Sequence, residues 1–351
     1  MAYWSVTRGA LLGHGYYDMT WLKETQQSLG YDRTYVSGHY YPVWLLWNPA
    51  PLLLPLMPLA ALTFTESTLA WLSISMLLYV HATLLFTRIL KQSILFPFVA
   101  AVVVAILFLP FFAALAWGQP TLLLGAFLIY AWQAQRRGQQ VAAGILLIPL
   151  LLKPHLLFIV LGLIGVVAIR NQQWRLIGTG IGGVLALGVV AFLLDPHWLP
   201  NWLAQGAPIA WETTALSDMI RVHLDLPPIA RFYGVGLGLL LAGWRYRGVT
   251  DISPHTLAEA TLLSSLCAPY LWYHDTVVLL PVVIWIAAIS WTWPLASLLL
   301  LQMALNAWLF YSEYIGAMDS SRYLLYLVLL LGWWFYSQGN SLLRRGSAPV
   351  G

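Results

Sequence analysis

The stretch VAAGILLIPLLLKPHLLFIVLGLIGVVAI occupies residues 141–169, and its apolar character is interrupted at Lys153, Pro154 and His155. A lysine deep in a bilayer costs roughly 3 kcal/mol on insertion scales, so it is retained where it meets a partner or a water-filled cavity. Because a proline removes a helix hydrogen bond, Pro154 and Pro149 predict a break in the helix here. Lys153 is therefore the first candidate functional residue.

The composition of the whole chain is typical of a membrane protein. Of its 351 residues, 60% are hydrophobic and 9% are charged, which sets it apart from soluble domains. The single cysteine, Cys267, excludes a disulfide framework and zinc clusters built on thiolates. The net charge of +4 comes from arginines and lysines at the ends of apolar segments, a pattern that indicates membrane topology and not a nucleic-acid partner.

Apolar segments long enough to cross a bilayer recur along the chain. They predict an all-α, polytopic membrane protein of one domain, with about ten to twelve membrane elements. We expect an external juxtamembrane region at 1–40, a transmembrane bundle at 41–340 and a cytoplasmic tail at 341–351. Besides the segment around Lys153, the predicted segments are 43–64, 68–86, 94–117, 121–135, 176–194, 229–244, 258–272, 276–293, 295–311 and 323–336.

Pairs of basic residues at segment ends predict the orientation, because cytoplasmic loops carry an excess of lysine and arginine. The chain between the second and third pairs must enter the membrane and return, on arms of about 14 residues, or about 21 Å. We expect a broken hairpin whose tip carries Lys153 and His155 into a cavity; the alternative is one long kinked helix. The pairs are Arg88 with Lys91, Arg136 with Arg137, Arg170 with Arg175, Arg245 with Arg247, and Arg344 with Arg345.

The proline-rich segment near the start conflicts with this orientation. If Tyr41 and Gly118 both lie outside, the three apolar segments between them cannot all cross the membrane. Residues 41–64 can be irregular or re-entrant, because each proline removes a helix hydrogen bond. The other solution is the opposite orientation of Arg88 and Lys91, and the sequence leaves both open.

Polar groups in three places are candidates for binding or catalysis. Gln119, after Gly118, offers a donor and an acceptor, although helix capping is an equal explanation. His274 can donate to an anion and Asp275 can take a proton, or Asp275 can simply favour a helix start. The N-terminal stretch mixes aromatic and charged residues, which suits a sugar or a membrane interface. Its residues include Tyr3, Trp4, Arg8, His14, Tyr16, Tyr17, Asp18, Trp21, His39, Tyr40 and Tyr41.

The sequence lacks the common motifs of nucleotide, metal and serine-nucleophile chemistry. It contains no phosphate-binding loop of the G-x-x-x-x-G-K-[ST] type, no metal-ligand spacing and no G-x-S-x-G. We therefore expect no cofactor and no metal. Any reaction would draw its energy from an activated substrate.

A series of short motifs is spread in order over residues 3–275. They are Tyr3-Trp4, Arg8 to Gly13, Tyr17-Asp18, Tyr41-Pro42, the run 55–59, Gly118-Gln119, Ala143-Gly144, Lys153-Pro154, Trp174-Arg175, Trp198 with Trp202, and Pro269 to Asp275. Their order resembles glycosyltransferase family 87. These multi-spanning enzymes of the GT-C fold include mycobacterial mannosyltransferases that use polyprenyl-phosphate-mannose.

The resemblance implies an inverting transfer of a hexose, mannose in the best-known members, from a polyprenyl-phosphate sugar donor to a lipid or glycan acceptor. The reaction would take place at the outer face of a bacterial plasma membrane. A carboxylate would deprotonate the acceptor hydroxyl, and cationic groups would hold the departing phosphate. The candidates are Asp18 and Asp275 for catalysis, Lys153, His155, His274 and Gln119 for the donor phosphate, and Tyr3, Trp4, Arg8 and Tyr41 for the substrate.

The sequence departs from the family at the catalytic base. In the family an aspartate stands just ahead of the Tyr-Trp pair, after a first transmembrane helix, and here Met1 and Ala2 occupy that place. We expect a missing N-terminal helix, an inactive chain, or a substitute carboxylate. Asp18 matches a family position that we expect to be structural. We expect Asp275 to lie nearer the donor phosphate. A lipid or solute transporter, which also uses broken helices, and a non-catalytic membrane subunit are the rival interpretations.

Overall fold

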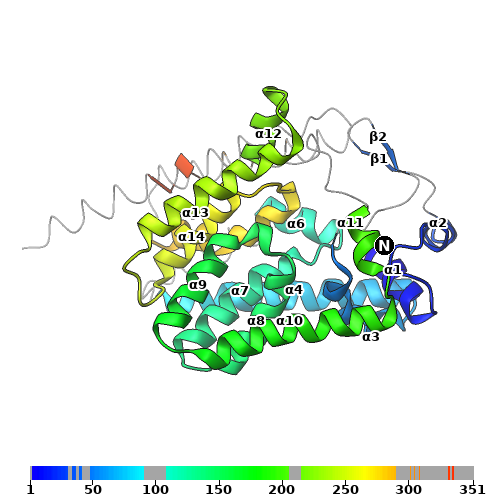
Figure 1. Cartoon of the computed structure of the whole chain (residues 1–351), viewed down its shortest axis with the longest axis horizontal. Helices are drawn as coiled ribbons and strands as arrows, with labels where there is room; N and C mark the ends of the chain where they lie inside the picture. The colour runs from blue at the N-terminus through cyan, green and yellow to red at the C-terminus, as the bar shows by residue number, and fades with distance from the viewer. Residues whose placement is uncertain are drawn as a thin grey trace, which may run out of the picture.

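A computed structural model gives the structure of the protein and describes residues 2–30, 34–36, 39–41, 48–90, 108–204 and 215–289, with isolated residues between 301 and 335. This part of the chain is helical apart from one short β-hairpin (Figure 1). The all-α prediction is confirmed at that level. The GT-C arrangement and the number of membrane elements stay predictions, because most of 94–107, 295–311, 323–336 and the tail lies outside the described residues.

Helices of very different length form the structure. The long ones are α4 (Phe64–Ile89) and α10 (Trp174–Leu194). The shorter ones are α1 (Ala2–Leu11), α2 (Met19–Ser28), α3 (Met57–Ala60), α6 (Leu109–Ala116), α7 (Thr121–Arg136), α8 (Gln140–Leu152), α9 (Phe158–Arg170), α11 (Trp198–Ala204), α12 (Leu216–His223), α13 (Tyr233–Arg245), α14 (Pro254–Leu266) and α15 (Leu280–Ile289). The 3-10 helices are η1 (Ala50–Leu56), η2 (Pro154–Leu156), η4 (Pro228–Phe232) and η5 (Tyr273–Leu279), and the strands β1 (Thr34–Val36) and β2 (His39–Tyr41) pair antiparallel.

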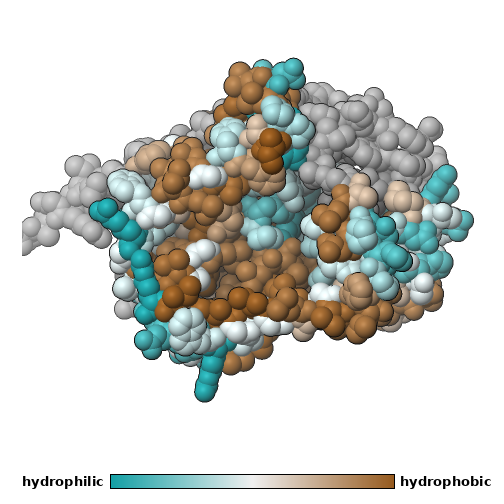
Figure 2. Space-filling view, in the orientation of Figure 1, coloured by the Kyte–Doolittle hydropathy of each residue, from teal (hydrophilic) through white to brown (hydrophobic). Residues whose placement is uncertain are grey.

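Within the described residues, α4 and α10 are the two helices long and apolar enough to cross a membrane. Both leave large apolar side chains uncovered: Leu77 on α4 is 65% exposed and Leu193 on α10 is 74% exposed. Figure 2 shows α10 as a brown row along the lower edge of the molecule. Extended apolar surface of this kind suits contact with lipid or a partner and not with water.

The proline-rich segment ahead of α4 does not form a spanning helix. Pro51 and Pro55 lie in the 3-10 helix η1, and α3 adds a single turn. α4 then begins at a capping box, in which Thr63 and Glu66 hydrogen-bond each other's backbone N–H at 3.0 and 3.3 Å. The expectation of an irregular segment is therefore confirmed for residues 50–60, and 42–47 lie outside the described residues.

α4 runs in the same direction as α7. Near their starts, the indole of Trp71 donates to the carbonyl of Gly118 at 3.0 Å. Near their ends, the ring of Phe86 meets that of Trp132 edge-on, with 5.5 Å between centroids. Arg88 therefore lies at the end where α7 finishes, and the opposite orientation of this arginine is not needed.

Three turns meet at that end of the bundle. Between α7 and α9–α10, Gln135 donates to Gln173 at 2.9 Å, and Arg170 donates to the carbonyls of Arg247 and Val249 at 2.7 Å each. α8 leaves this end and α9 returns to it, so the broken hairpin is confirmed and the single long helix is wrong. We call it the basic end, since it carries Arg88, Arg136, Arg137, Arg170, Arg175, Arg245 and Arg247.

The opposite end, where Gly118 and Lys153 lie, is called the site end. There α1 and α2 pack around Tyr16 and Leu22 in a small hydrophobic core that also holds Leu53 of η1 and Ala191 of α10. Asp195, after α10, accepts a hydrogen bond from the backbone N–H of Tyr16 at 3.0 Å. The N-terminal region is thus packed onto the helices and does not lie apart from them.

α8 packs closely on α10 because of a glycine. A Cβ at Gly144 would stand 2.6 Å from the carbonyl oxygen of Leu176 and 2.7 Å from the Cβ of Thr179. Small residues at such positions let two helix backbones approach each other. This contact holds the first arm of the broken hairpin, and with it Lys153, against α10.

Gly144→Ala should force α8 away from α10 and lower the free energy of unfolding by about 1–3 kcal/mol, the usual cost of overpacking. Gly182→Ala on α10 is the matched control, since an added Cβ there meets nothing within 4 Å. The control should be neutral or stabilising, because alanine favours a helix by about 1 kcal/mol over glycine. Thermal unfolding in detergent compares the two, and equal melting temperatures would contradict the close approach.

Candidate functional site

The helix break positions Lys153. α8 ends at Leu152, and Lys153 leaves the helix with φ −130° and ψ 58°. Pro154 starts the 3-10 helix η2, a place where a proline is tolerated because its missing N–H would be unsatisfied anyway. The break sets the lysine against η5, where its Nζ lies 2.9 Å from Oδ1 of Asp275.

Lys153 and Asp275 form a buried ion pair. The lysine side chain is 6% exposed and the aspartate side chain 0%. Thr121 donates its hydroxyl to the same carboxylate oxygen at 2.6 Å, and the N–H of Trp272 donates to the other oxygen at 3.4 Å. A charged pair is tolerated away from water only when its remaining hydrogen bonds are made. The lysine thus meets a partner inside the protein, and its ammonium is enclosed instead of standing in an open cavity.

His274 lies on the rim of this pair. Its Nε2 is 3.9 Å from Oδ1 of Asp275, and its ring stacks on Trp272 with 6.0 Å between centroids. At that distance there is no direct hydrogen bond. The imidazole is therefore close enough to interact electrostatically with the carboxylate. Its nitrogen atoms can still bind a ligand.

His155 stacks on Tyr270, with 4.0 Å between ring centroids and 3.2 Å between its Nδ1 and the phenol oxygen. Its Nε2 is buried and has no hydrogen-bond partner among the described residues. Buried polar atoms without a hydrogen-bond partner are rare, because each one lowers the stability of the folded protein. The Nε2 of His155 is a candidate contact for a ligand.

A second buried carboxylate lies on α12. Asp218, 0% exposed, pairs with Arg221 at 2.9 Å and with Arg231 at 3.7 Å. Two guanidinium groups therefore lie beside one buried carboxylate. Our sequence predictions did not include these residues, although the i,i+3 spacing of Asp218 and Arg221 was an available signal.

This group adjoins the Lys153 site. Ser217 donates to the carbonyl of Ala268 at 2.7 Å, which holds α12 against the segment that leads into η5. Two residues after Ala268, Tyr270 stacks on His155, so α12 and the Lys153 site meet at this segment.

Tyr3 and Gln119 meet at the same end. The phenol of Tyr3 donates to Oε1 of Gln119 at 2.9 Å and accepts from Nδ2 of Asn48 at 2.7 Å. Burial raises the pKa of Tyr3, and the charge of Asp275 raises it further. The structure thus brings α1, the turn before α7 and η5 close together, and Asn48 is a partner that our sequence predictions missed.

Trp4 and Arg8 have other contacts. The indole of Trp4 donates to the carbonyl of Leu62 at 3.3 Å, and the guanidinium of Arg8 donates to that of Ala60 at 3.1 Å. These bonds fasten α1 to the segment between α3 and α4, which is a structural task. Tyr41 lies in β2, and its side chain falls outside the described residues.

Asp18 caps α2. Its Oδ1 accepts from the N–H groups of Thr20 and Trp21 at 3.0 and 3.1 Å, and its Oδ2 lies 3.3 Å from Nδ1 of His14. The hydrogen bond from Trp21 lowers the pKa of Asp18 most, and His14 lowers it further. A carboxylate stabilised in its charged form is a weaker base. The geometry therefore favours a structural role for Asp18 over a catalytic one.

Asp18→Ala should lower the free energy of unfolding by about 1 kcal/mol. Asp18→Asn should lower it by much less, since asparagine caps a helix equally well. The folded pKa of Asp18 lies below its unfolded value. The charged carboxylate therefore adds stability above about pH 4, which is lost as the pH falls through the folded pKa. Thermal unfolding at neutral and acid pH measures both effects. A cap role is wrong if Asp18→Ala unfolds like the parent.

Lys153→Met should destabilise the protein by about 3–5 kcal/mol, because it leaves the Asp275 charge buried without its partner. Adding Asp275→Asn to that variant removes the stranded charge and should recover much of the loss. The measurement is a double-mutant cycle of unfolding free energies. If the two single changes simply add, the two side chains are not coupled as a pair.

Comparison with known proteins found no relative of this chain. No family model, no curated protein and no solved structure matches the chain. The resemblance to glycosyltransferase family 87 remains a prediction from the order of its motifs, and the case for a function rests on the residues at the site end.

Proposed function

We propose that the chain is a multi-pass membrane glycosyltransferase, which moves a hexose from a polyprenyl-phosphate donor to a lipid or glycan acceptor at the outer face of the membrane. The observation that supports this most is the buried Lys153–Asp275 pair with two histidines beside it. His155 follows the lysine in η2 and His274 precedes the aspartate in η5. Cationic groups suit the negative charge of the leaving phosphate, and a carboxylate suits the proton of the attacking hydroxyl.

The cationic side of the site suits a phosphate ester. An ammonium has three donors, and the hydrogen bond from Lys153 to Asp275 uses one of them. The Nε2 of His155 is buried without a partner in the described part of the chain. Charge-assisted hydrogen bonds from such groups would stabilise the negative charge that develops on a departing polyprenyl phosphate.

The carboxylate side suits proton transfer. In the proposed reaction the acceptor oxygen attacks the anomeric carbon, the bond from that carbon to the phosphate oxygen breaks, and Asp275 takes the hydroxyl proton. As long as Lys153 holds Asp275, the carboxylate is a weak base. A donor phosphate that draws the ammonium toward itself would raise the basicity of Asp275, so the base becomes effective when the donor is bound.

The proposed lipid donor also needs an apolar surface. α10 exposes Leu185 by 64% and Leu193 by 74%, and α13 exposes Leu240 by 75%. On the face drawn in Figure 2, paler and teal side chains lie in a recess between the brown surfaces of α12 and α11. A polyprenyl chain could lie on the apolar helices while its phosphate reaches polar side chains.

A non-catalytic subunit that binds a lipid phosphate is the second candidate. The observation in its favour is that neither proposed base is free: Asp275 is 0% exposed with hydrogen bonds to Lys153 and Thr121, and Asp18 caps a helix. Such a protein would keep the phosphate site and lack transfer. Binding and turnover must therefore be measured separately.

His155→Phe keeps a ring against Tyr270 and removes the buried Nε2. We expect it to weaken binding of a short-chain polyprenyl-phosphate-mannose by about tenfold, the loss of one charge-assisted hydrogen bond. His81→Phe is the matched control, because His81 lies 2.8 Å from the phenol of Tyr130 in a similar pair on α4 and α7. Isothermal titration in detergent gives both affinities, and equal losses would remove His155 from the site.

The same preparations separate the two candidate functions. In an enzyme, Asp275→Asn should leave donor binding within a few-fold and lower sugar transfer by roughly 10² to 10⁴, the worth of a general base. Transfer of radiolabelled mannose to an extracted lipid acceptor is the readout. A parent chain that binds the donor and transfers nothing supports the subunit; a parent chain that does neither contradicts both.

A further inference from the structure

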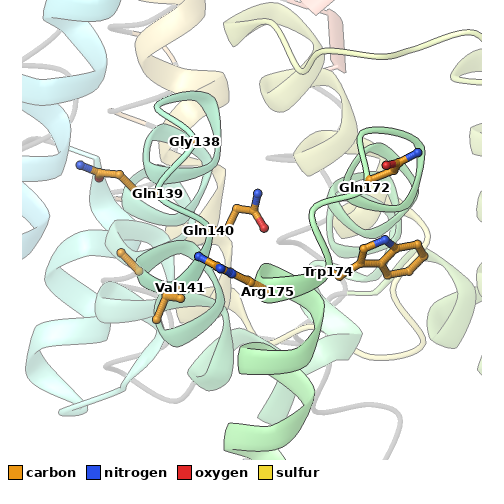
Figure 3. Close-up of a pocket in the computed structure, with 8 residues that line it drawn as sticks. Gly138, Gln139, Gln140, Val141, Gln172, Trp174 and Arg175 are labelled. Atoms are coloured by element: carbon orange, nitrogen blue, oxygen red, sulfur yellow. The ribbon is translucent and has the colours of Figure 1, made fainter.

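A pocket of about 560 Å³ lies at the basic end, at the far end of the hairpin arms from Lys153. The turn between α7 and α8 forms one wall and the turn between α9 and α10 forms the other. Figure 3 shows the two turns facing each other, with the side chains of Gln140 and Arg175 extending into the space between them. No aspartate or glutamate is among the lining residues, so the pocket is set up for a negative group.

Arg175 is the cation available in this pocket. Its guanidinium makes no hydrogen bond or ion pair with the described residues, and it is exposed. Neighbouring arginines are occupied: Arg136 lies 5.1 Å from the ring of Trp132, and Arg170 donates to two backbone carbonyls. A free guanidinium can hold two phosphate oxygens at once.

Two helix N-termini border the same pocket. α8 and α10 begin after Gln139 and Gln173, and neither residue caps its helix with a side chain. The N–H groups of Val141, Ala142 and Trp174 belong to these first turns, where no intrahelical acceptor exists. Together with the guanidinium they offer an anion several donors from two sides.

Apolar surface continues directly from the pocket. Val141 and Trp174 in its wall are 49% and 60% exposed, and Ile145 and Ile181, one to two turns further along α8 and α10, are 53% and 54% exposed. Tryptophan is enriched where a membrane protein meets the headgroup region. A ligand here would have its charge among donors and its chains on aliphatic side chains, which a soluble anion does not need.

We propose that this pocket binds the phosphate of an anionic phospholipid, with the acyl chains lying along α8 and α10. Arg175 and the first-turn N–H groups hold the phosphate oxygens, Gln140 contacts the polar headgroup, and Trp174 lies at the level of the glycerol. Basic pockets between membrane helices commonly take such headgroups. The inference rests on the membrane embedding alone and is independent of sugar transfer.

The test titrates the purified full chain, in a neutral detergent, with short-chain phosphatidylglycerol, and native mass spectrometry counts the bound lipid. Phosphatidylcholine with the same acyl chains and inorganic phosphate are the comparison ligands. Arg175→Gln should weaken binding of phosphatidylglycerol by about tenfold or more. Arg247→Gln removes the same charge at the basic end, outside the pocket wall, and should change the affinity by less than about twofold.

Ala142→Glu guards against a folding artefact. An acidic residue in the first turn favours the helix, so this variant should fold, yet it puts a negative charge in the pocket wall and should weaken the lipid as strongly as Arg175→Gln. Equal losses from Arg175→Gln and Arg247→Gln would overturn the proposal, since binding would then follow net charge. Equal binding of phosphatidylcholine, or displacement of the lipid by millimolar inorganic phosphate, would also overturn it.

Discussion

A charge that leaves water must meet its counter-charge, and this requirement organises the site end of the protein. The Lys153 ammonium and the Asp275 carboxylate lie 122 residues apart in the chain and 2.9 Å apart in space, both enclosed by the bundle. Their contact requires α8 to stop at Leu152, η5 to follow the turn at Trp272, and Thr121 to start α7 beside them. Moving any one of these elements would strand a buried charge.

In the proposed enzyme, a functional role and a structural role fall on the same two residues. An ion pair that only stabilised the bundle would need no imidazole with a buried, unpartnered nitrogen next to it, and His155 supplies one. A site that only bound an anion would need no buried carboxylate. In the proposed enzyme the two requirements meet, because the carboxylate holds the lysine in place until a phosphate competes for it.

The two ends of the bundle differ in the way they present charge. At the site end charges are buried and matched, as Asp218 is by Arg221 and Arg231. At the basic end most arginines are exposed and have no acidic partner among the residues that the structure describes, which suits a surface that faces anionic headgroups. The apolar faces of α4 and α10 run between these ends.

Local features of the sequence determined the helical class, the break at Lys153, the irregular segment around Pro51 and Pro55, and the gathering of arginines at one end. Each depends on composition, on proline chemistry or on residues a few positions apart, which one sequence displays. Only the tertiary structure decided that Asp275 is the partner of Lys153 and that Arg8 fastens α1 to the chain before α4. The physical reason is that the residues around a charged side chain in the sequence do not identify its partner. Packing between helices brings the two together, across 122 residues for Lys153 and Asp275 and across 52 residues for Arg8 and Ala60.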